Sequence, residues 1–195
     1  MNKKMILFPL CAALLLSGCS SLSKNGEEKK NWPEGTVQIG STAGITAPER
    51  FTLLDNKETL AADGLYYASW GTGSCVPYEN DEGDTVDLYD AQLYFLTSES
   101  MSEEKAEGDR DKWLAVAKEN YEVHTENSVT LNGQTYTVLT YDCISEDSPY
   151  DRGVSAFGVC GTTAVCAELT CLEDYTEDLE TILTEFLNGC YFTID

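Results

Sequence analysis

Five carboxylate residues surround one glycine in a short segment, and together they could bind a hard cation. They are Glu79, Asp81, Glu82, Asp84 and Asp87. Calcium takes about six to eight oxygen ligands, many of them carboxylates. The spacing differs from the EF-hand loop, because the closing glutamate at position twelve is missing. Two interpretations stay open, a calcium site and an acidic surface loop, and no other cofactor is expected.

Aromatic residues form a second group with possible chemistry. Tyr66, Tyr67, Trp70 and Tyr78 belong to one expected strand and the loop that follows it. Exposed aromatic side chains on a rigid sheet can stack on a sugar or anchor a protein partner. Aromatic residues are also common in ordinary strands. The hypothesis is a ligand-contact patch formed by these four residues.

Catalytic chemistry has little support in the sequence. His124 is the only histidine, and in an extended segment it shares a face with Glu122 and Glu126, so we expect it to be exposed. The sequence has no Gly-x-Ser-x-Gly elbow to present a serine nucleophile. We therefore assign no catalytic residue and expect a protein that is not an enzyme. The alternative is a cell-envelope enzyme acting on polysaccharide through paired carboxylates, with Glu168 and Asp142 the acids most nearly embedded in apolar strands.

Six cysteines follow residue 70, at positions 75, 143, 160, 166, 171 and 190, and none shows the Cys-x-x-Cys spacing of structural zinc sites. Cys160 and Cys166 flank an expected hairpin turn at Gly161-Thr162-Thr163, so the pattern predicts that they form a disulfide. Small buried thiols that pack as apolar residues are the alternative.

The chain is strongly acidic, with 12 Lys and Arg against 34 Asp and Glu and a formal net charge of −22 at pH 7. A surface of this charge repels the phosphate backbone, so nucleic acid is excluded as a partner. The charge is distributed along the chain and favours solubility in an exposed location, or recognition of a cation or basic partner.

The first residues predict export. Lys3 and Lys4 precede an apolar run from Met5 to Leu16 that is too short to span a membrane. The sequence Leu16-Ser17-Gly18-Cys19 resembles the lipobox of bacterial lipoproteins. The resemblance implies removal of the signal peptide, residues 1–18, and attachment of a diacylglyceryl group to the Cys19 thiol, with further acylation of its amine by a fatty acid such as palmitate. An ordinary secretory signal with an incidental Cys19 is the alternative.

Anchoring by lipid would hold the protein outside the cytoplasm on a cell membrane, with the bilayer as its first partner. Residues 19–35 are polar and nearly free of apolar side chains, so we expect a flexible tether. Residues 36–195 are long enough for a single domain with a substantial core.

Strand patterns dominate this domain. Segments 64–70 and 86–96 are rich in alternating apolar residues, and in the second Tyr89, Ala91, Leu93 and Phe95 share one face. Asn132-Gly133 predicts a hairpin between 129–131 and 134–143, and 154–160 with 164–171 forms a second hairpin. In 135–141 both faces carry large apolar residues, so this strand is expected to be central.

Two amphipathic helices are predicted. The first covers about 102–120, with a capping box formed by Ser100 and Glu103. The second covers about 176–188, begins at Asp174 or Thr176, and precedes a last strand at 190–194. A sheet covered on two faces by helices implies an α+β fold, an α/β/α sandwich on a mostly antiparallel central sheet.

The order strand, helix, hairpin, hairpin, helix, strand resembles the PsbP-like group, which includes the extrinsic P subunit of photosystem II and many bacterial lipoproteins. The closing stretch Ala167-Glu168-Leu169-Thr170, followed by 179–192, carries the same resemblance. It implies a PsbP-like domain that acts by binding or assembly. The sequence therefore predicts a membrane-tethered lipoprotein that binds a protein or glycan of the cell envelope.

Overall fold

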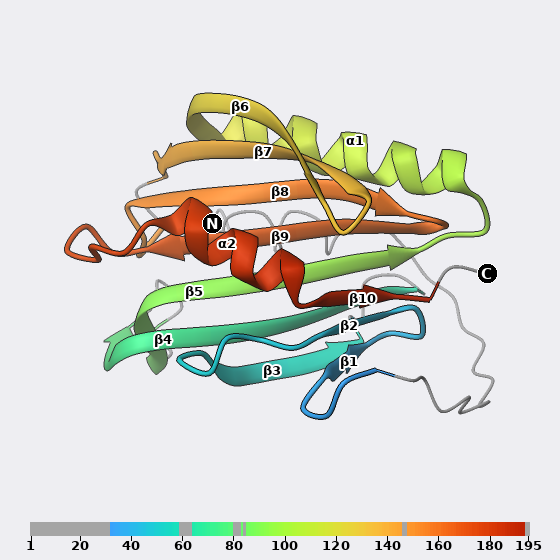
Figure 1. Cartoon of the computed structure of the whole chain (residues 1–195). Helices are drawn as coiled ribbons and strands as arrows, with labels where there is room; N and C mark the ends of the chain where they lie inside the picture. The colour runs from blue at the N-terminus through green and yellow to red at the C-terminus, as the bar shows by residue number, and fades with distance from the viewer. Residues whose placement is uncertain (1–31, 59–63, 80–82, 84, 146–147, 194–195) are drawn as a thin grey trace.

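Two antiparallel sheets and two helices make up the computed structural model, which describes residues 32–58, 64–79, 83, 85–145 and 148–193 (Figure 1). The leader, Cys19 and all of the expected tether before residue 32 lie outside these residues. The larger sheet has seven strands, in the order β3 (Thr52–Glu58), β4 (Leu65–Glu79), β5 (Thr85–Glu99), β9 (Thr163–Cys171), β8 (Arg152–Cys160), β7 (Gln134–Cys143), β6 (Tyr121–Leu131). The predicted α+β class with an antiparallel central sheet is confirmed.

The smaller sheet has three strands, in the order β1 (Val37–Ile39), β2 (Ala43–Ile45), β10 (Cys190–Phe192). The predicted last strand therefore exists, but it pairs with β2 and not with the central sheet. The carboxylate of Glu99, at the end of β5, accepts hydrogen bonds from the backbone N–H of Thr42 at 2.9 Å and from the Thr42 hydroxyl at 3.1 Å. This contact attaches the small sheet to the large one.

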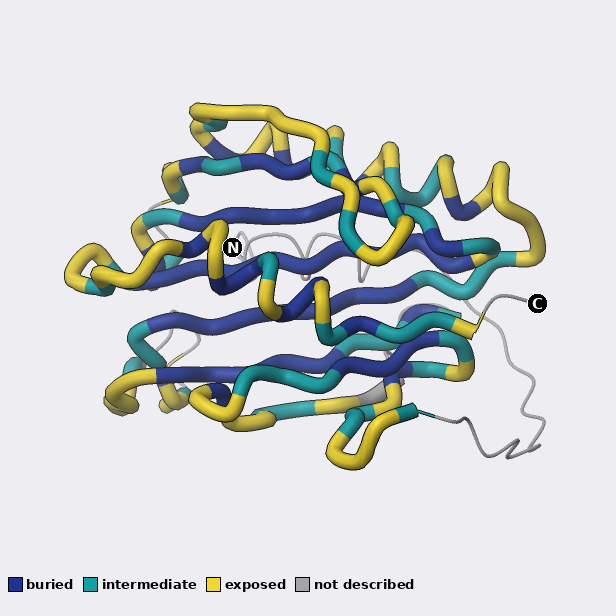
Figure 2. Tube along the Cα trace, in the orientation of Figure 1, coloured by how far each residue is buried: buried dark blue, intermediate teal, exposed yellow. Residues whose placement is uncertain are grey.

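The two helices cover opposite faces of the large sheet. The first helix, α1 (Glu103–Asn120), contributes Trp113 and Ala117 to a core cluster that includes Leu139 and Phe157. The second helix, α2 (Leu179–Asn188), packs with the small sheet into the other cluster, whose large residues include Trp70. Figure 2 shows the strands between these layers as mostly buried. The predicted α/β/α arrangement is confirmed.

The bounds of the first helix match the predicted range of about 102–120, but its cap differs, and the second helix begins later than predicted. Ser102 is the N-cap of α1, where its Oγ accepts a hydrogen bond from the Lys105 N–H, so the predicted capping box at Ser100 is wrong. The N-cap of α2 is Asp178, beyond Asp174 and Thr176. The acidic residues before Asp178 are therefore free to form a loop between β9 and α2.

The predicted hairpins are confirmed. Asn132 and Gly133 both have positive φ, 51° and 79°, as a type I′ turn requires, and they join β6 to β7. In β7, Tyr136 and Val138 face one core cluster, while Leu139 and Tyr141 face the other, so this strand is covered on both sides. Within the described residues, no helix is long and apolar enough to cross a membrane.

Candidate binding pocket

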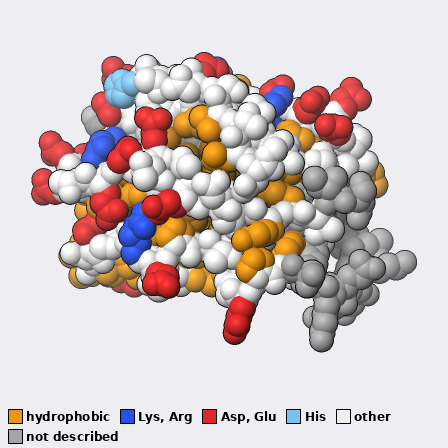
Figure 3. Space-filling view, viewed as in Figure 1, with side chains coloured by type: hydrophobic (Ala, Val, Ile, Leu, Met, Phe, Trp, Pro, Cys, Tyr) orange, Lys and Arg blue, Asp and Glu red, His pale blue; other side chains and the backbone are white. Residues whose placement is uncertain are grey.

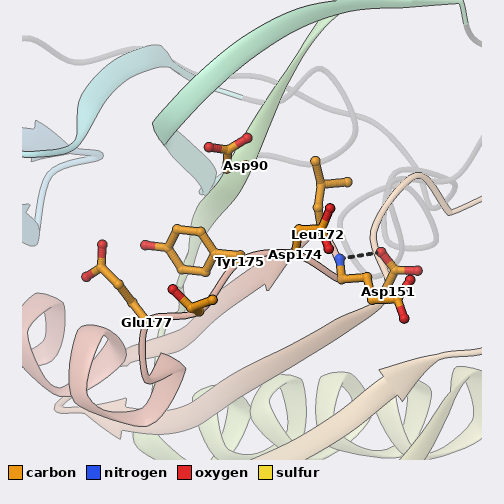
Figure 4. Close-up of a pocket in the computed structure, with 8 residues that line it drawn as sticks. Asp90, Asp151, Leu172, Asp174, Tyr175 and Glu177 are labelled. Carbon is orange, nitrogen blue, oxygen red and sulfur yellow. Dashed lines mark hydrogen bonds between the residues drawn. The ribbon is translucent and has the colours of Figure 1, made fainter.

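The pocket lies where β9 ends and the chain turns towards α2. Asp90 projects into it from β5, Asp151 comes from the residue before β8, and residues 172–177 form its remaining wall (Figure 4). Its volume is ≈ 490 Å³. This volume lies within the range of about 300–1,000 Å³ that is typical of small-molecule sites.

Backbone hydrogen bonds hold the wall in place. The Leu172 N–H donates to the Asp90 carbonyl at 3.0 Å, and the Asp151 N–H donates to the Cys171 carbonyl at 3.0 Å. The Glu173 N–H donates to the Asp151 carboxylate at 2.8 Å, the bond drawn in Figure 4. The two bonds between backbone groups extend the β5, β9 and β8 pairing by one residue, so the pocket lies at the end of the sheet.

The lining is acidic. It contains the carboxylates of Asp90, Asp151, Glu173, Asp174 and Glu177, together with Leu172, Tyr175 and Thr176. Arg50 forms ion pairs with Glu177 at 3.4 Å and with Glu185 at 2.6 Å. Among the ion pairs between described residues, none involves the other four lining carboxylates. The pocket therefore carries uncompensated negative charge.

Tyr175 forms the aromatic part of the wall. Burial, and then the negative charge of Glu177, raise the pKa of Tyr175 to about 12, so its hydroxyl stays protonated at neutral pH. The guanidinium of Arg152 donates to the backbone carbonyl of Tyr175 and so anchors the loop to β8. An aromatic ring beside several carboxylates is a suitable environment for an organic cation.

The predicted calcium segment lies elsewhere. Glu79 and Asp87 are exposed near the tip of the β4–β5 hairpin, and Asp81, Glu82 and Asp84 lie outside the described residues. Thr85 pairs with Glu79, and Asp87 pairs with Pro77, so the Glu79 and Asp87 side chains share a face of the hairpin. Within the described residues, no group of three or more His, Cys, Asp or Glu side chains is arranged to hold a metal ion. The calcium interpretation stays a prediction.

The predicted aromatic patch does not form one surface. Trp70 is only 1% exposed and packs against Phe186 at a ring-centroid distance of 5.8 Å, so its assignment to a contact patch is wrong. Tyr66 and Tyr67 are half-buried against opposite core clusters, because neighbouring residues of a strand point to opposite faces. Tyr78 is half-buried in β4 beyond the bulge that follows Thr72.

The predicted disulfide between Cys160 and Cys166 is also wrong. Cys160 pairs with Thr163 across the hairpin, and Cys166 pairs with Phe157. The two thiols consequently lie on opposite faces of the sheet, Cys160 in the cluster under α2 and Cys166 in the cluster under α1. Both side chains are buried.

His124 is exposed, as predicted, at a bulge in the edge strand β6. Its Nε2 lies 3.0 Å from a carboxylate oxygen of Asp142, and both side chains are about half exposed. Three strands separate β6 from β5, which carries Asp90 of the pocket. Asp142 is thus a partner of His124 and not an embedded acid.

Glu168 is the acid that the sheet buries. It is 2% exposed and accepts hydrogen bonds from the hydroxyls of Tyr121 and Tyr141, the second at 3.0 Å. The Tyr141 hydroxyl also lies 2.9 Å from the hydroxyl of Ser155. Burial, and then the charge of Glu168, raise the pKa of both tyrosines well above the usual value, so both remain hydrogen-bond donors.

Sequence reasoning missed the pocket. It assigned no binding role to Asp90, to Asp151 or to the segment from Glu173 to Glu177. One local signal for the pocket is present in the sequence. Four acidic residues lie within positions 173–178, one residue after a fully buried strand ends. Their convergence with Asp90 depends on the pairing of β5 with β9, which has no local signature.

No protein-family model matches the sequence, and no curated protein matches it. Among solved structures, the chain is similar to a protein from Bacteroides thetaiotaomicron, with 8% identity and a TM-score of 0.40, covering 77% of this chain and 45% of that one. It is also similar to a protein of unknown function from Pseudomonas aeruginosa, with 15% identity and a TM-score of 0.32, covering 52% of this chain and 85% of that one. A third similar structure is cyanobacterial PsbP (CyanoP) from Synechocystis sp. PCC 6803, with 10% identity and a TM-score of 0.47, covering 86% of this chain and 98% of that one.

Proposed function

We propose that this protein is a lipid-anchored binding module outside the cytoplasm, and that its acidic pocket receives a positively charged group of its partner. The lining of the pocket carries this proposal. Five carboxylates and one tyrosine ring surround a volume of ≈ 490 Å³, and only Glu177 among those acids is ion-paired to a basic residue of the described chain.

The fixed position of the lining supports a binding role. Asp90 extends from β5, where its carboxylate accepts a hydrogen bond from the Ser74 N–H at 2.7 Å. Asp151 is held by the Glu173 N–H. A ligand that meets groups already in place loses less conformational entropy on binding than one that must order a loop.

The charge of the whole chain supports a cationic ligand. The formal net charge is −22, and acidic side chains predominate over basic ones on the face in Figure 3. A field of this sign concentrates cations near the surface and accelerates their association. An ammonium or guanidinium group on a protein partner has the chemistry that the pocket selects.

The proposed location rests on the leader and on Cys19. Two or more acyl chains suffice for stable membrane attachment, at about 0.8 kcal/mol per buried methylene. We expect Cys19→Ser to move the protein from the membrane fraction to the soluble fraction and to abolish incorporation of labelled palmitate. Labelled palmitate on the Cys19→Ser protein would contradict the assignment of the lipid to this residue.

Binding can be tested by thermal unfolding of the full chain with an oligolysine peptide, and with the same peptide fully acetylated as a neutral control. At about 100 times Kd a ligand adds roughly 2.7 kcal/mol to stability, which raises Tm by about 5 to 10 °C for a chain of this size. We expect this rise only with the charged peptide, and a smaller rise at high salt because screening weakens the attraction.

Matched variants locate the site. Asp174→Asn and Glu173→Gln each remove one charge from the pocket and should reduce the peptide-induced rise. Glu104→Gln removes one exposed charge from the first turn of α1 and should leave it unchanged. Equal losses in all three variants would mean attraction to net charge alone and would refute the pocket. A rise with calcium that Asp81→Asn abolishes would instead support the predicted calcium segment.

A further inference from the structure

Two arginines contact the loop between β9 and α2, and they contact it in different ways. Arg50 reaches side chains, because its Nε lies 3.4 Å from the carboxylate of Glu177 and its Nη2 lies 2.6 Å from that of Glu185. Arg152 reaches the backbone, because its Nη2 donates a hydrogen bond to the carbonyl of Tyr175. One arginine therefore pairs with charges, and the other holds the course of the chain.

The hydrogen bond from Arg152 goes to a carbonyl although the chain is rich in acids. The sequence has 34 Asp and Glu residues, yet among the ion pairs between described residues none involves Arg152. Its neighbours in the register are Asp142 on β7 and Cys171 on β9. A hydrogen bond from a charged donor is about twice as strong as a neutral one. The guanidinium therefore stabilises the position of the loop.

A turn separates the two ends of this loop segment. The Tyr175 N–H donates to the Leu172 carbonyl at 3.1 Å, which closes a turn of four residues. The start of the turn is joined to the sheet, because the Leu172 N–H donates to the Asp90 carbonyl at 3.0 Å. Arg152 does the same for the end of the turn, since it binds the carbonyl of Tyr175 from β8.

The end of the turn carries the aromatic wall of the pocket. Tyr175 lines it, and so do the next two residues, Thr176 and Glu177 (Figure 4). An arginine close to an acidic site would by its charge alone weaken the binding of a cation, because like charges repel. The two arginines consequently differ in what their removal should do.

We propose that Arg152 is a positioning residue of the pocket, which increases the affinity for cations by holding Tyr175 and its neighbours in place, although it carries the same charge as the ligand. This inference rests on the proposed function of the pocket. Without the contact, only a fraction of the molecules would have an ordered wall, and the apparent affinity falls by that fraction. A hydrogen bond to a charged group can shift such a local equilibrium by about tenfold or more.

The sign of the change in affinity tests the proposal. The full chain is titrated at low salt with the oligolysine peptide, and the fully acetylated peptide is the neutral control. Arg152→Gln should weaken binding by about three- to tenfold, because fewer molecules have an ordered wall. Arg50→Gln is the matched control, since it removes the same charge and two contacts to carboxylates. It should strengthen binding by about two- to fivefold.

A second variant separates geometry from charge. Arg152→Lys keeps the positive charge but lacks the planar fork of donors, so weaker binding by this variant cannot come from a change in charge. We expect its affinity to lie below that of wild type. Stronger binding by Arg152→Gln, in parallel with Arg50→Gln, would overturn the proposal, because Arg152 would then act on the ligand only through its charge.

Amide hydrogen exchange tests the same proposal without a ligand. The Tyr175 N–H should exchange about tenfold faster in Arg152→Gln than in wild type, and at the wild-type rate in Arg50→Gln. The Leu172 N–H, at the start of the turn, is the internal reference. An unchanged Tyr175 rate in Arg152→Gln would overturn the proposal. If wild-type protein does not bind the peptide, the proposed function fails, while the exchange rates still show whether Arg152 positions the loop.

Discussion

The Tyr141 hydroxyl reaches across one strand to hydrogen-bond the buried carboxyl of Glu168 at 3.0 Å. Tyr141 lies in β7 and Glu168 in β9, and Ser155 of the intervening strand β8 pairs with Glu168 in the register. Tyr121 completes the group, with its ring stacked on that of Tyr141 at a centroid distance of 4.0 Å. A polar group in the core is stable only when its hydrogen bonds are satisfied, so this cluster fixes how β6 to β9 align.

Glu168→Gln should destabilise the protein by about 1–3 kcal/mol, because both tyrosine hydroxyls donate to Glu168 Oε1 and a neutral amide oxygen is a weaker acceptor than a carboxylate. The change would appear as a lower midpoint in urea denaturation. The exposed Glu119→Gln in α1 serves as the control and should match wild type. An unchanged midpoint for Glu168→Gln would contradict a structural role for the cluster.

High pH should unfold the protein through its buried tyrosines. Burial raises the pKa of Tyr121, Tyr136 and Tyr141 above the value of about 10 found in unfolded chains. The folded state then holds protons that the unfolded state releases, so their contribution is fully present below pH ~10 and is lost as pH rises above it. Tyrosinate absorbance and circular dichroism should change together in this range. Full tyrosinate formation with an intact dichroism spectrum would refute the prediction.

Trp70→Ala should cost about 3–5 kcal/mol, the usual loss for a large aromatic side chain in a core. Trp70 packs on Phe186, which also contacts Phe51 at a centroid distance of 4.7 Å, so the substitution removes part of the contact between β4 and α2. Tyr78→Ala, at a half-buried position, should cost less than about 1 kcal/mol. Thermal unfolding of the two variants distinguishes a core residue from a surface one, and a Trp70→Ala protein as stable as wild type would restore the contact-patch hypothesis.

Ser102→Ala should destabilise the protein by about 1 kcal/mol, because it leaves the Lys105 N–H at the start of α1 without its acceptor. Ser128→Ala, at an exposed position of β6, is the matched control and should have almost no effect. Chemical denaturation of both variants measures the difference. Equal stability of the two variants would mean that Ser102 does not cap the helix.

Local signals explain the parts of the fold that were predictable. Asn132 and Gly133 tolerate positive φ, so they favour a type I′ turn, and this turn joins β6 to β7 in a hairpin. The apolar positions of α2, Leu179, Ile182, Leu183, Phe186 and Leu187, follow the helical period, and all are buried. Large apolar residues on both faces of β7 correctly predicted a covered central strand.

The cysteine error shows how a single residue changes the outcome. A three-residue turn, Gly161-Thr162-Thr163, would place Cys160 and Cys166 on the same face. The turn has two residues, so Cys160 pairs with Thr163 and every later residue of β9 changes face relative to β8. Cys160 therefore lies in the core cluster under α2, and Cys166 lies in the cluster under α1.

The sequence by itself determined both helices and most strands of the large sheet, because periodicity and turn residues act over a few neighbouring positions. It predicted none of β1, β2 and β3. The tertiary structure alone decided that Trp70 is core and that Glu168 is buried beside two tyrosines. It also brought Asp90, Asp151 and residues 172–177 into one acidic pocket. The physical reason is that these arrangements depend on pairing between distant strands, where the free energy comes from burying surfaces that no short window of sequence contains.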